Sequence, residues 1–217
     1  MDWNVGAGLG DKGVIVTGAA GGIGAEVVRA FAAAGARVAA VDVDAASVRE
    51  VVGALDGAER HLALAADLRD VGAHPRLVET VRDALGSVDV LAHVAAVLRR
   101  RSDIDEISED DWDFQHDVNL RATFFLNKAV ARAMRDAGRG GRIINFTSQG
   151  WLTGGFGGSV AYAATKGGIV SLSRGLARTL APHGITVNTV APGAVDTPMM
   201  WSGMTEADMA EFVKQIP

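Results

Sequence analysis

A run of glycines between a short apolar strand and a helix constrains the fold more than any other feature of this chain. Residues 13–17 read Gly-Val-Ile-Val-Thr, and residues 25–34 carry apolar side chains at helical spacing before Gly35 ends the helix. Residues 17–24 join the two and read Thr-Gly-Ala-Ala-Gly-Gly-Ile-Gly. Glycine permits a tight turn and a close backbone approach, and the start of a helix presents N–H groups to an anion. The segment therefore predicts a loop that holds a dinucleotide pyrophosphate, and the missing Gly-Lys-Ser/Thr ending excludes a nucleoside triphosphate loop.

Strands and helices alternate along the rest of the chain. Apolar, β-branched runs predict further strands at 37–41, 61–65, 88–94, 142–146 and 185–190. Helical spacing and capping signals predict helices around 77–85, 108–134, 161–180 and 205–214. This alternation predicts a parallel sheet with right-handed crossovers and helices on both faces, although the pattern leaves the strand order open. We expect one Rossmann-type, doubly wound α/β/α domain over residues 11–217, preceded by an N-terminal extension over residues 1–10.

Composition excludes several classes of function. A length of 217 residues suits one domain, and a formal net charge of −5 argues against a nucleic-acid-binding face. The absence of cysteine excludes a disulfide framework, a cysteine zinc site and a cysteine nucleophile, and we expect no metal in the site. The first ten residues lack the pattern of a signal peptide, and no apolar stretch approaches the ~20 residues of a membrane span. We therefore expect a cytoplasmic protein with neither nucleic acid nor membrane as a partner.

Asp42 follows the second predicted strand, 18 residues after Gly24. A carboxylate at this point of a dinucleotide-binding unit accepts hydrogen bonds from the adenosine ribose. It also repels a 2′-phosphate, and the glycine loop contains no basic residue that would attract one. This pattern favours NAD(H) over NADP(H). The alternative interpretation is that Asp42 only caps a turn with Asp44.

Tyr162 is the single tyrosine of the chain, and Lys166 is one of four lysines. The spacing of four residues places both side chains on one helix face. A free phenol has a pKa of ~10, and a neighbouring ammonium favours the phenolate and lowers that value. Such a phenol can exchange a proton with an alcohol or a carbonyl oxygen. The alternative is a surface tyrosine next to a solvated lysine.

Three motifs in this order resemble those of the short-chain dehydrogenase/reductase family, in its classical form. Residues 17–24 are similar to the family's T-G-x-x-x-G-x-G loop, and residues 162–166 match its Y-x-x-x-K motif. Residues 192–197, Pro-Gly-Ala-Val-Asp-Thr, resemble the P-G-x-x-x-T stretch that contacts the nicotinamide side of the cofactor. The resemblance covers nearly the whole chain and implies an NAD(P)-dependent oxidoreductase.

Single residues between these motifs extend the resemblance and imply roles. Tyr162 would be the acid/base, and Lys166 would lower its pKa and hold the nicotinamide ribose. Ser148, at the end of the fifth strand, would orient the substrate oxygen, and Asn119 would support a water relay to Lys166. Together with Asp42, the implied cofactor-binding residues are Gly18, Gly22, Ile23, Gly24, Asp67, Leu68, Ala95, Tyr162, Lys166, Pro192, Gly193, Val195 and Thr197.

Two departures from the family pattern carry expectations of their own. Residues 93–96 read His-Val-Ala-Ala where the family has Asn-Asn-Ala-Gly. We expect this change to affect stability before catalysis, and we interpret His93 as a structural residue at a strand end. Family members also continue beyond Pro217 with a seventh strand. We therefore expect a sheet without its last strand and an incomplete sequence.

Residues near the open end of the site should set specificity. They are mostly apolar and predict a hydrophobic or cyclic alcohol or ketone, although packing beneath the last helix is an equal alternative: Trp151, Leu152, Phe156, Met199, Met200 and Trp201. Three arginines at 99–101 could indicate an acidic substrate or an acyl-carrier partner, but acidic residues follow them, which favours a solvated loop. The long helices carry apolar residues on more than one face, and the resemblance implies a homodimer or homotetramer.

The leading hypothesis is an NAD-dependent dehydrogenase of secondary alcohols that uses a Tyr-Lys-Ser mechanism. One alternative is an NADPH-dependent 3-oxoacyl-thioester (acyl-carrier-protein) reductase, against which Asp42 argues. An alternative of another class is a dinucleotide-binding sensor or scaffold without turnover. The intact set of Ser148, Tyr162 and Lys166 argues against that third hypothesis.

Overall fold

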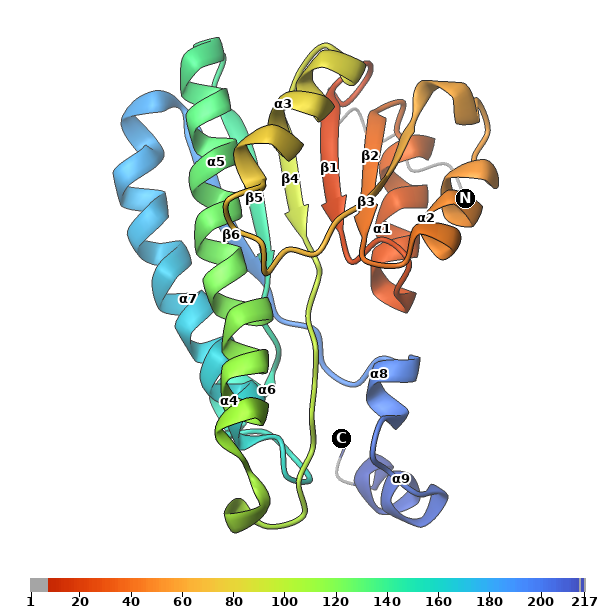
Figure 1. The fold of residues 1–217 in the computed structure, drawn as a ribbon, viewed down its shortest axis with the longest axis vertical. Coiled ribbons are helices and arrows are strands. Elements are labelled where there is room, and N and C mark those ends of the chain that lie inside the picture. Colours follow the sequence, from red (N-terminus) through yellow and green to blue (C-terminus); the bar gives the residue numbers. More distant parts are fainter. Residues whose placement is uncertain (1–7, 215, 217) are drawn as a thin grey trace.

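Six parallel strands form one sheet in the order β3-β2-β1-β4-β5-β6 (Figure 1). The computed structural model describes residues 8–214 and residue 216. Its strands are β1 (Gly13–Thr17), β2 (Arg37–Asp42), β3 (Leu62–Ala65), β4 (Val90–His93), β5 (Gly141–Phe146) and β6 (Ile185–Val190). The predicted doubly wound sheet is confirmed, and the order reverses between β1 and β4, where α/β sheets of this type bind ligands.

Helices cover the two faces of the sheet unequally. α1 (Gly22–Ala33) and α2 (Ala45–Gly53) pack on one face of β1, β2 and β4. α3 (His74–Leu85), α5 (Ala122–Ala137) and the end of α7 (Val160–Leu180) pack on the other face. Along β6 only Ile185 and Val187 are buried, and the other four residues are exposed within the described part of the chain. Helices cover both faces of the sheet, as predicted, but they cover this edge strand less completely.

The helix predicted over residues 108–134 consists of three segments. α4 (Glu109–His116) begins at the predicted capping box, in which Asp111 N donates to Ser108 Oγ at 3.1 Å. A π-helical segment (Asp117–Arg121) follows and leads into α5. A π-helical turn changes which side chains face the sheet, and such turns occur frequently at functional sites. This one contains Asn119.

α2 is a helix that periodicity did not predict. It begins at Asp44, whose carboxylate accepts hydrogen bonds from Ala46 N at 2.9 Å and Ser47 N at 3.2 Å. At the level of sequence, Asp44 enters only the alternative interpretation of Asp42, as part of a turn, and a helix cap at this residue was not predicted. Further short elements are α6 (Gly150–Thr153), α8 (Pro198–Trp201), α9 (Glu206–Val213) and single 3-10 turns at Ala58–Arg60, Ile104–Glu106 and Ala181–His183.

The loop after β4 and the α8–α9 segment extend beyond the carboxyl ends of the strands, at the bottom of Figure 1. Residues 1–7 of the expected N-terminal extension lie outside the described residues. Among the helices that are described, none is both long enough and apolar enough to cross a membrane.

Candidate active site

The glycine loop after β1 is packed so closely that two of its glycines cannot be replaced. Gly18 has a φ of +65°, and a Cβ atom there would lie 2.7 Å from the Cα atom of Ala95. A Cβ atom at Gly24 would lie 1.9 Å from the carbonyl oxygen of Gly18. Both neighbours are backbone atoms, which cannot move aside as a flexible side chain can. The loop therefore has the compact turn that a pyrophosphate requires.

The start of α1 has the features of an anion-binding site. Its N-cap residue is Gly21, and no side chain of the described residues caps its first turn. Its N–H groups and the positive end of the helix dipole therefore remain for a phosphate. A Cβ atom at Gly22 would lie 2.7 Å from Thr197 Cγ2, so the segment after β6 lies against the start of this helix. The structure therefore brings together Gly22 of the glycine loop and Thr197 of the segment after β6, both of which are predicted cofactor-binding residues.

Asp42 makes contacts that fit both interpretations of the residue. Its Oδ1 accepts a hydrogen bond from Asp44 N at 3.2 Å, which is the turn contact. Its Oδ2 accepts a hydrogen bond from Ala20 N at 2.9 Å, which ties the carboxylate to the glycine loop. Asp42 is only partly buried. Its carboxylate therefore lies beside the loop, where it can meet a ribose.

Asp67 and Leu68 differ in their surroundings. The exposed Asp67 carboxylate forms an ion pair with Arg69 at 2.6 Å, and this hydrogen bonding lowers its pKa. The Leu68 side chain is buried in the core between the sheet and α3, and its carbonyl oxygen bonds to His74 Nε2 at 2.9 Å. Leu68 therefore has a packing role in addition to any contact that its backbone makes with an adenine.

Lys166 extends from α7 across the carboxyl end of β5. Its Nζ donates a hydrogen bond to the carbonyl oxygen of Phe146 at 2.8 Å and lies 5.4 Å from the centroid of the Tyr162 ring. The side chain is buried, with 1% of its surface exposed. Burial lowers the pKa of Lys166 to about 7, because an apolar surrounding penalises the ammonium. Thr147 Oγ1 also donates to the Lys166 carbonyl oxygen at 2.8 Å, which fixes α7 against β5.

The pKa of Tyr162 differs from the sequence expectation. Burial raises it above its ordinary value, whereas the Ser148 hydroxyl and the charge of Arg100 act in the opposite direction. Lys166 is not among the groups that lower the pKa of Tyr162, and its ammonium donates a hydrogen bond to the Phe146 carbonyl oxygen. The predicted lowering by Lys166 is therefore not found in this structure. The positions agree with the prediction, since Ser148, Tyr162 and Lys166 lie together beyond the end of β5.

Asn119 joins three segments around the site. Its Oδ1 accepts a hydrogen bond from Val97 N at 2.8 Å, and its Nδ2 donates to Val97 O at 2.9 Å and to Thr165 Oγ1 at 3.2 Å. The side chain is buried, so these bonds hold the loop after β4, the π-helical segment and α7 in place. The Asn119 side-chain amide therefore has a structural role in this arrangement. Thr165 therefore also belongs to this site. This residue was not predicted from the sequence, and its position next to Lys166 is the signal that could have indicated it.

His93 is a buried residue at the end of β4, as predicted. The Thr17 hydroxyl accepts a hydrogen bond from Ala95 N at 3.2 Å and lies 2.8 Å from His93 Nδ1. A hydroxyl can donate one hydrogen bond and accept two, so this network fits His93 Nδ1 either as the acceptor or as the donor. The Nε2 atom of His93 has no hydrogen-bond partner among the described residues. Burial lowers the pKa of His93 to about 3, and the charges of Lys166 and His74 act in the same direction.

We expect His93 to make the free protein sensitive to mild acid. The pKa is 6.5 in an unfolded chain and about 3 in the fold, so only the unfolded chain binds a proton between these values. The free energy of unfolding should therefore fall as the pH falls below 6.5, by about 1.4 kcal/mol per pH unit from this group. Denaturant titrations at several pH values should show a shallower slope for His93→Asn than for the wild type. Equal slopes would show that another group is responsible.

The three arginines at 99–101 lie in two different environments. Arg99 pairs with Asp110 at 2.6 Å, and Arg101 pairs with Asp111 at 2.7 Å. The partners are acidic, but both arginines are partly buried and bind to α4, which differs from the predicted solvated loop. Arg100 instead faces Tyr162, near enough for its charge to lower the pKa of the phenol.

The apolar residues predicted around the substrate also divide into two groups. Trp151, Leu152 and Trp201 remain 37%, 71% and 43% exposed. Phe156 instead packs against Phe212 of α9, with ring centroids 4.7 Å apart. Packing against the last helix thus explains Phe156, while the exposed residues are available to a substrate.

The chain is similar to known short-chain dehydrogenases in sequence and in structure. The family model for short chain dehydrogenases matches residues 12–208. The (2S)-[(R)-hydroxy(phenyl)methyl]succinyl-CoA dehydrogenase subunit BbsD of Thauera aromatica is 36% identical, over 97% of this chain and 83% of that protein. Sorbitol dehydrogenase of Cereibacter sphaeroides is 37% identical, over 94% of this chain and 77% of that protein.

A solved structure, the 3-ketoacyl-(acyl-carrier-protein) reductase from Brucella melitensis complexed with NADH, has 29% identity and a TM-score of 0.85. The match covers 92% of this chain and 82% of that protein. The match to the family model extends from the strand before the glycine loop to the last helix. The chain therefore belongs to the short-chain dehydrogenase family and is an oxidoreductase.

Proposed function

We propose that this enzyme transfers a hydride between NAD(H) and a secondary alcohol or ketone. The observation that carries the proposal is the convergence of Ser148, Tyr162 and Lys166 beside the glycine loop, at the carboxyl edge of the sheet. The nicotinamide supplies the hydride chemistry when it is bound. The chain's own residues supply binding, orientation and proton transfer.

In alcohol oxidation Tyr162 acts as the general base. Its phenolate oxygen takes the proton of the substrate hydroxyl as the hydride leaves the carbinol carbon. The Ser148 hydroxyl donates a hydrogen bond to the substrate oxygen and orients it. In ketone reduction the phenol returns the proton to the carbonyl oxygen. The hydrogen bond of the Ser148 hydroxyl and the positive charge of Arg100 favour the phenolate.

The residues around the glycine loop fit a dinucleotide. The backbone of Gly18, Gly22 and Gly24 would hold the pyrophosphate at the uncapped start of α1. Asp42 would accept hydrogen bonds from the adenosine ribose. Lys166 has further N–H donors for the nicotinamide ribose, because its contact with Phe146 uses only one of them.

The test of this proposal is a titration of the protein with NADH and NADPH, followed by nicotinamide fluorescence and a screen of secondary alcohols. Tight binding of NADH together with turnover supports the proposal. Binding of neither dinucleotide contradicts it. A preference for NADPH favours the second candidate, an NADPH-dependent acyl-thioester reductase. The similar 3-ketoacyl-(acyl-carrier-protein) reductase was solved with NADH, so it supports a reductase of this type but not the use of NADPH.

We expect Asp42→Asn to weaken the preference for NADH. The amide oxygen can still accept the hydrogen bond of Ala20 N, but the negative charge that repels a 2′-phosphate is gone. The ratio of the NADPH and NADH dissociation constants should fall about 10-fold, which corresponds to one charged hydrogen bond. Asp44→Asn is the matched control and should leave the ratio unchanged. An unchanged ratio in Asp42→Asn would show that this carboxylate does not select the cofactor.

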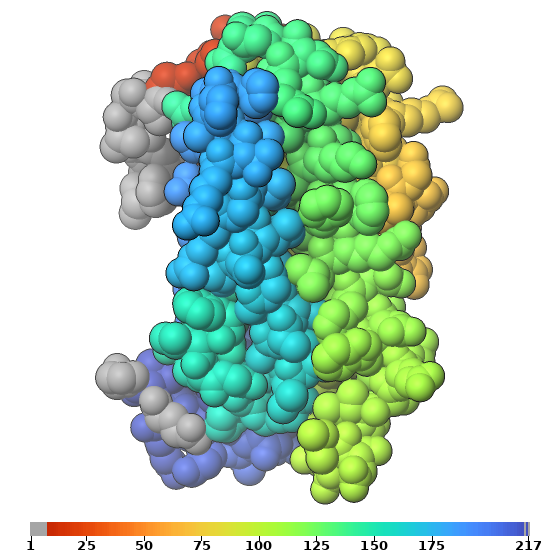
Figure 2. Space-filling model, turned by 90° about the vertical axis from the view of Figure 1, so that its left-hand side faces the viewer, coloured from red at the N-terminus to blue at the C-terminus, as the bar shows by residue number. Residues whose placement is uncertain are grey.

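For the assembly, we propose a homodimer or homotetramer that uses the faces of α4, α5 and α7. Figure 2 shows α7 and the α4–α5 region side by side on one broad face of the molecule. Trp112 of α4 and Phe124 of α5 are 45% and 39% exposed. Light scattering of the purified protein tests this, and a monomer at micromolar concentration would contradict it.

A further inference from the structure

Arg100 is a half-buried cation whose hydrogen bonds all go to uncharged groups. Its Nε donates to Ser202 O at 2.9 Å, its Nη1 to Phe156 O at 3.1 Å and its Nη2 to Met200 O at 3.3 Å. A guanidinium carries more N–H donors than these contacts use. No carboxylate within residues 8–214 forms an ion pair with Arg100, in contrast to Arg99 and Arg101. Within the described part of the chain, no carboxylate therefore neutralises the charge of this guanidinium.

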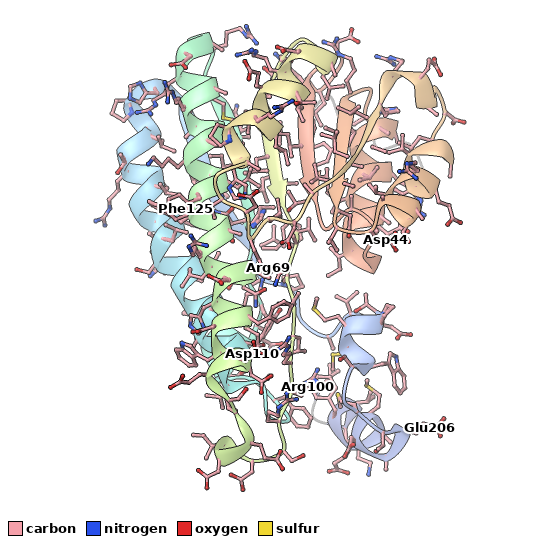
Figure 3. All side chains as sticks on the ribbon, in the orientation of Figure 1. Asp44, Arg69, Arg100, Asp110, Phe125 and Glu206 are labelled. Carbon is pink, nitrogen blue, oxygen red and sulfur yellow. The ribbon has the colours of Figure 1, made fainter. Side chains whose placement is uncertain are left out.

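The position of Arg100 places this charge at the candidate active site. Two of its carbonyl partners belong to the α8 region, and the third belongs to the loop that leads into α7 and Tyr162. Figure 3 shows Arg100 beyond the carboxyl ends of the strands, between the α4 side of the molecule and α9. Its charge lowers the pKa of Tyr162, and Tyr162 in turn acts to raise the pKa of Arg100 against the effect of burial.

The local backbone holds Arg100 in this place. Arg101 N donates a hydrogen bond to Gly158 O at 3.2 Å, and a Cβ atom at Gly158 would lie 1.6 Å from Arg101 O. The loop before α7 thus packs directly on the arginine segment. On the opposite side Arg99 and Arg101 are bound to α4 by their ion pairs. Arg100 is presented to the site by a backbone that is fixed from both sides.

We propose that Arg100 binds a carboxylate of the substrate, and that the natural substrate is therefore a hydroxy carboxylic acid or the corresponding oxo acid. This inference rests on the proposed dehydrogenase function and names its substrate class. An arginine fork matches the geometry of a carboxylate and forms charge-assisted hydrogen bonds with it. The backbone carbonyl oxygens accept hydrogen bonds from some N–H groups of Arg100, but they carry no net charge that would balance the guanidinium.

The charge of Arg100 acts on Tyr162, and this position favours a substrate whose carboxylate is close to the reacting carbon. The neighbouring cations, Arg99 and Arg101, are already paired, so a dianionic phosphate would find only one available partner in this segment. A phosphate at the far end of an acyl-thioester would also lie away from the reacting oxygen. The apolar side chains that remain exposed near the site, Trp151 and Leu152, can contact the rest of the substrate.

The first experiment measures binding and does not depend on turnover. The NADH complex is titrated with benzoate and with benzamide, which have the same shape and differ in charge. We expect benzoate to bind about 10- to 100-fold more tightly, as for a charged hydrogen-bonded pair. Equal affinities, or binding of neither compound, would overturn the proposal. Absence of NADH binding itself would overturn the proposed function and this inference with it.

The second experiment compares mandelate with methyl mandelate, and 3-hydroxybutyrate with its methyl ester, as substrates. We expect the wild type to prefer each acid by about 10- to 100-fold in kcat/KM. Arg100→Gln should remove this preference, so that each acid loses about 10- to 100-fold more kcat/KM than its ester, and Arg99→Gln should retain the preference. The loss of the Arg100 charge beside Tyr162 affects acid and ester alike and cancels in this comparison. Turnover of the esters alone would leave the dehydrogenase function standing and refute the carboxylate site.

A purely structural role of Arg100 predicts a different result. If the residue only holds α8 and the loop before α7, Arg100→Gln lowers the rates of acids and esters equally. Arg100→Lys keeps the charge but loses the fork, and it should retain part of the preference for acids. The Lys variant also preserves the test if Arg100→Gln does not fold. Equal loss for both substrate types in both variants contradicts the proposal.

Discussion

Replacing Tyr162 by phenylalanine is expected to lower kcat for alcohol oxidation by about 1,000-fold, because the variant lacks the group that takes the substrate proton. The ring that lies 5.4 Å from Lys166 Nζ is retained, so NADH affinity and thermal stability should change little. Steady-state kinetics and an NADH titration of the same preparation separate the two effects. Unchanged turnover would remove Tyr162 from the mechanism.

A direct measurement supports this test, because Tyr162 is the single tyrosine of the chain. The ultraviolet absorbance of the phenolate, followed as the pH rises, therefore reports the ionisation of this residue alone. Burial raises the pKa of Tyr162, so the transition in the free protein should lie above the ordinary value of 10.0. The Tyr162→Phe variant is the control and should show no transition. A transition below 10 would mean that nearby charges outweigh burial.

Below its pKa the phenol is protonated and cannot act as a base. The rate of alcohol oxidation should therefore increase with pH toward the pKa of Tyr162 in the enzyme–cofactor complex, whereas ketone reduction uses the protonated form and should decrease over the same range. Parallel profiles in both directions would contradict the assignment of Tyr162 as the acid/base.

The second large effect is expected for Gly24→Ala. The added Cβ atom would lie 1.9 Å from the carbonyl oxygen of Gly18, so the turn after β1 must open. We expect the free energy of unfolding to fall by about 3 kcal/mol, as for severe overpacking, and NADH affinity to fall at least about 100-fold because the loop geometry is lost. Denaturant titration and NADH fluorescence measure the two quantities.

Gly53→Ala is the matched control. Gly53 ends α2, and a Cβ atom there meets nothing within 4 Å. Alanine favours the helix over glycine, so this variant should be as stable as the wild type or more stable by about 0.5 kcal/mol. NADH affinity should stay the same. If Gly24→Ala behaved like this control, the glycine loop would not have the close packing described above.

Much of the fold was predictable because its signals are local. The runs at β1 and β6 have the bounds that the pattern predicted, and the capping box at Ser108 begins a helix as expected. The missed helix α2 also has a local signal, since Asp44 caps it. That helix is short, and its cap lies directly after a strand, where turn residues are common.

The site was predictable where one motif carries several residues. The spacing of Tyr162 and Lys166 places them on one helix, and the helix is observed. The pKa of Tyr162 was not predictable, because it depends on burial and on Ser148 and Arg100, which come from other segments. The contacts of Arg100 with the α8 segment and with the loop before α7 were not predictable either, because they join residues 56 to 102 positions apart.

The sequence by itself determined the alternation of strands and helices, the glycine loop and the residues that carry the chemistry. Each of these depends on residues a few positions apart, whose geometry follows from helix and strand periodicity. Only the tertiary structure decided the strand order, the contact of Lys166 with Phe146, the burial of His93 against Thr17 and the charge that Arg100 brings to the site. These features join segments far apart in the chain, and they depend on which surfaces pack together and exclude water.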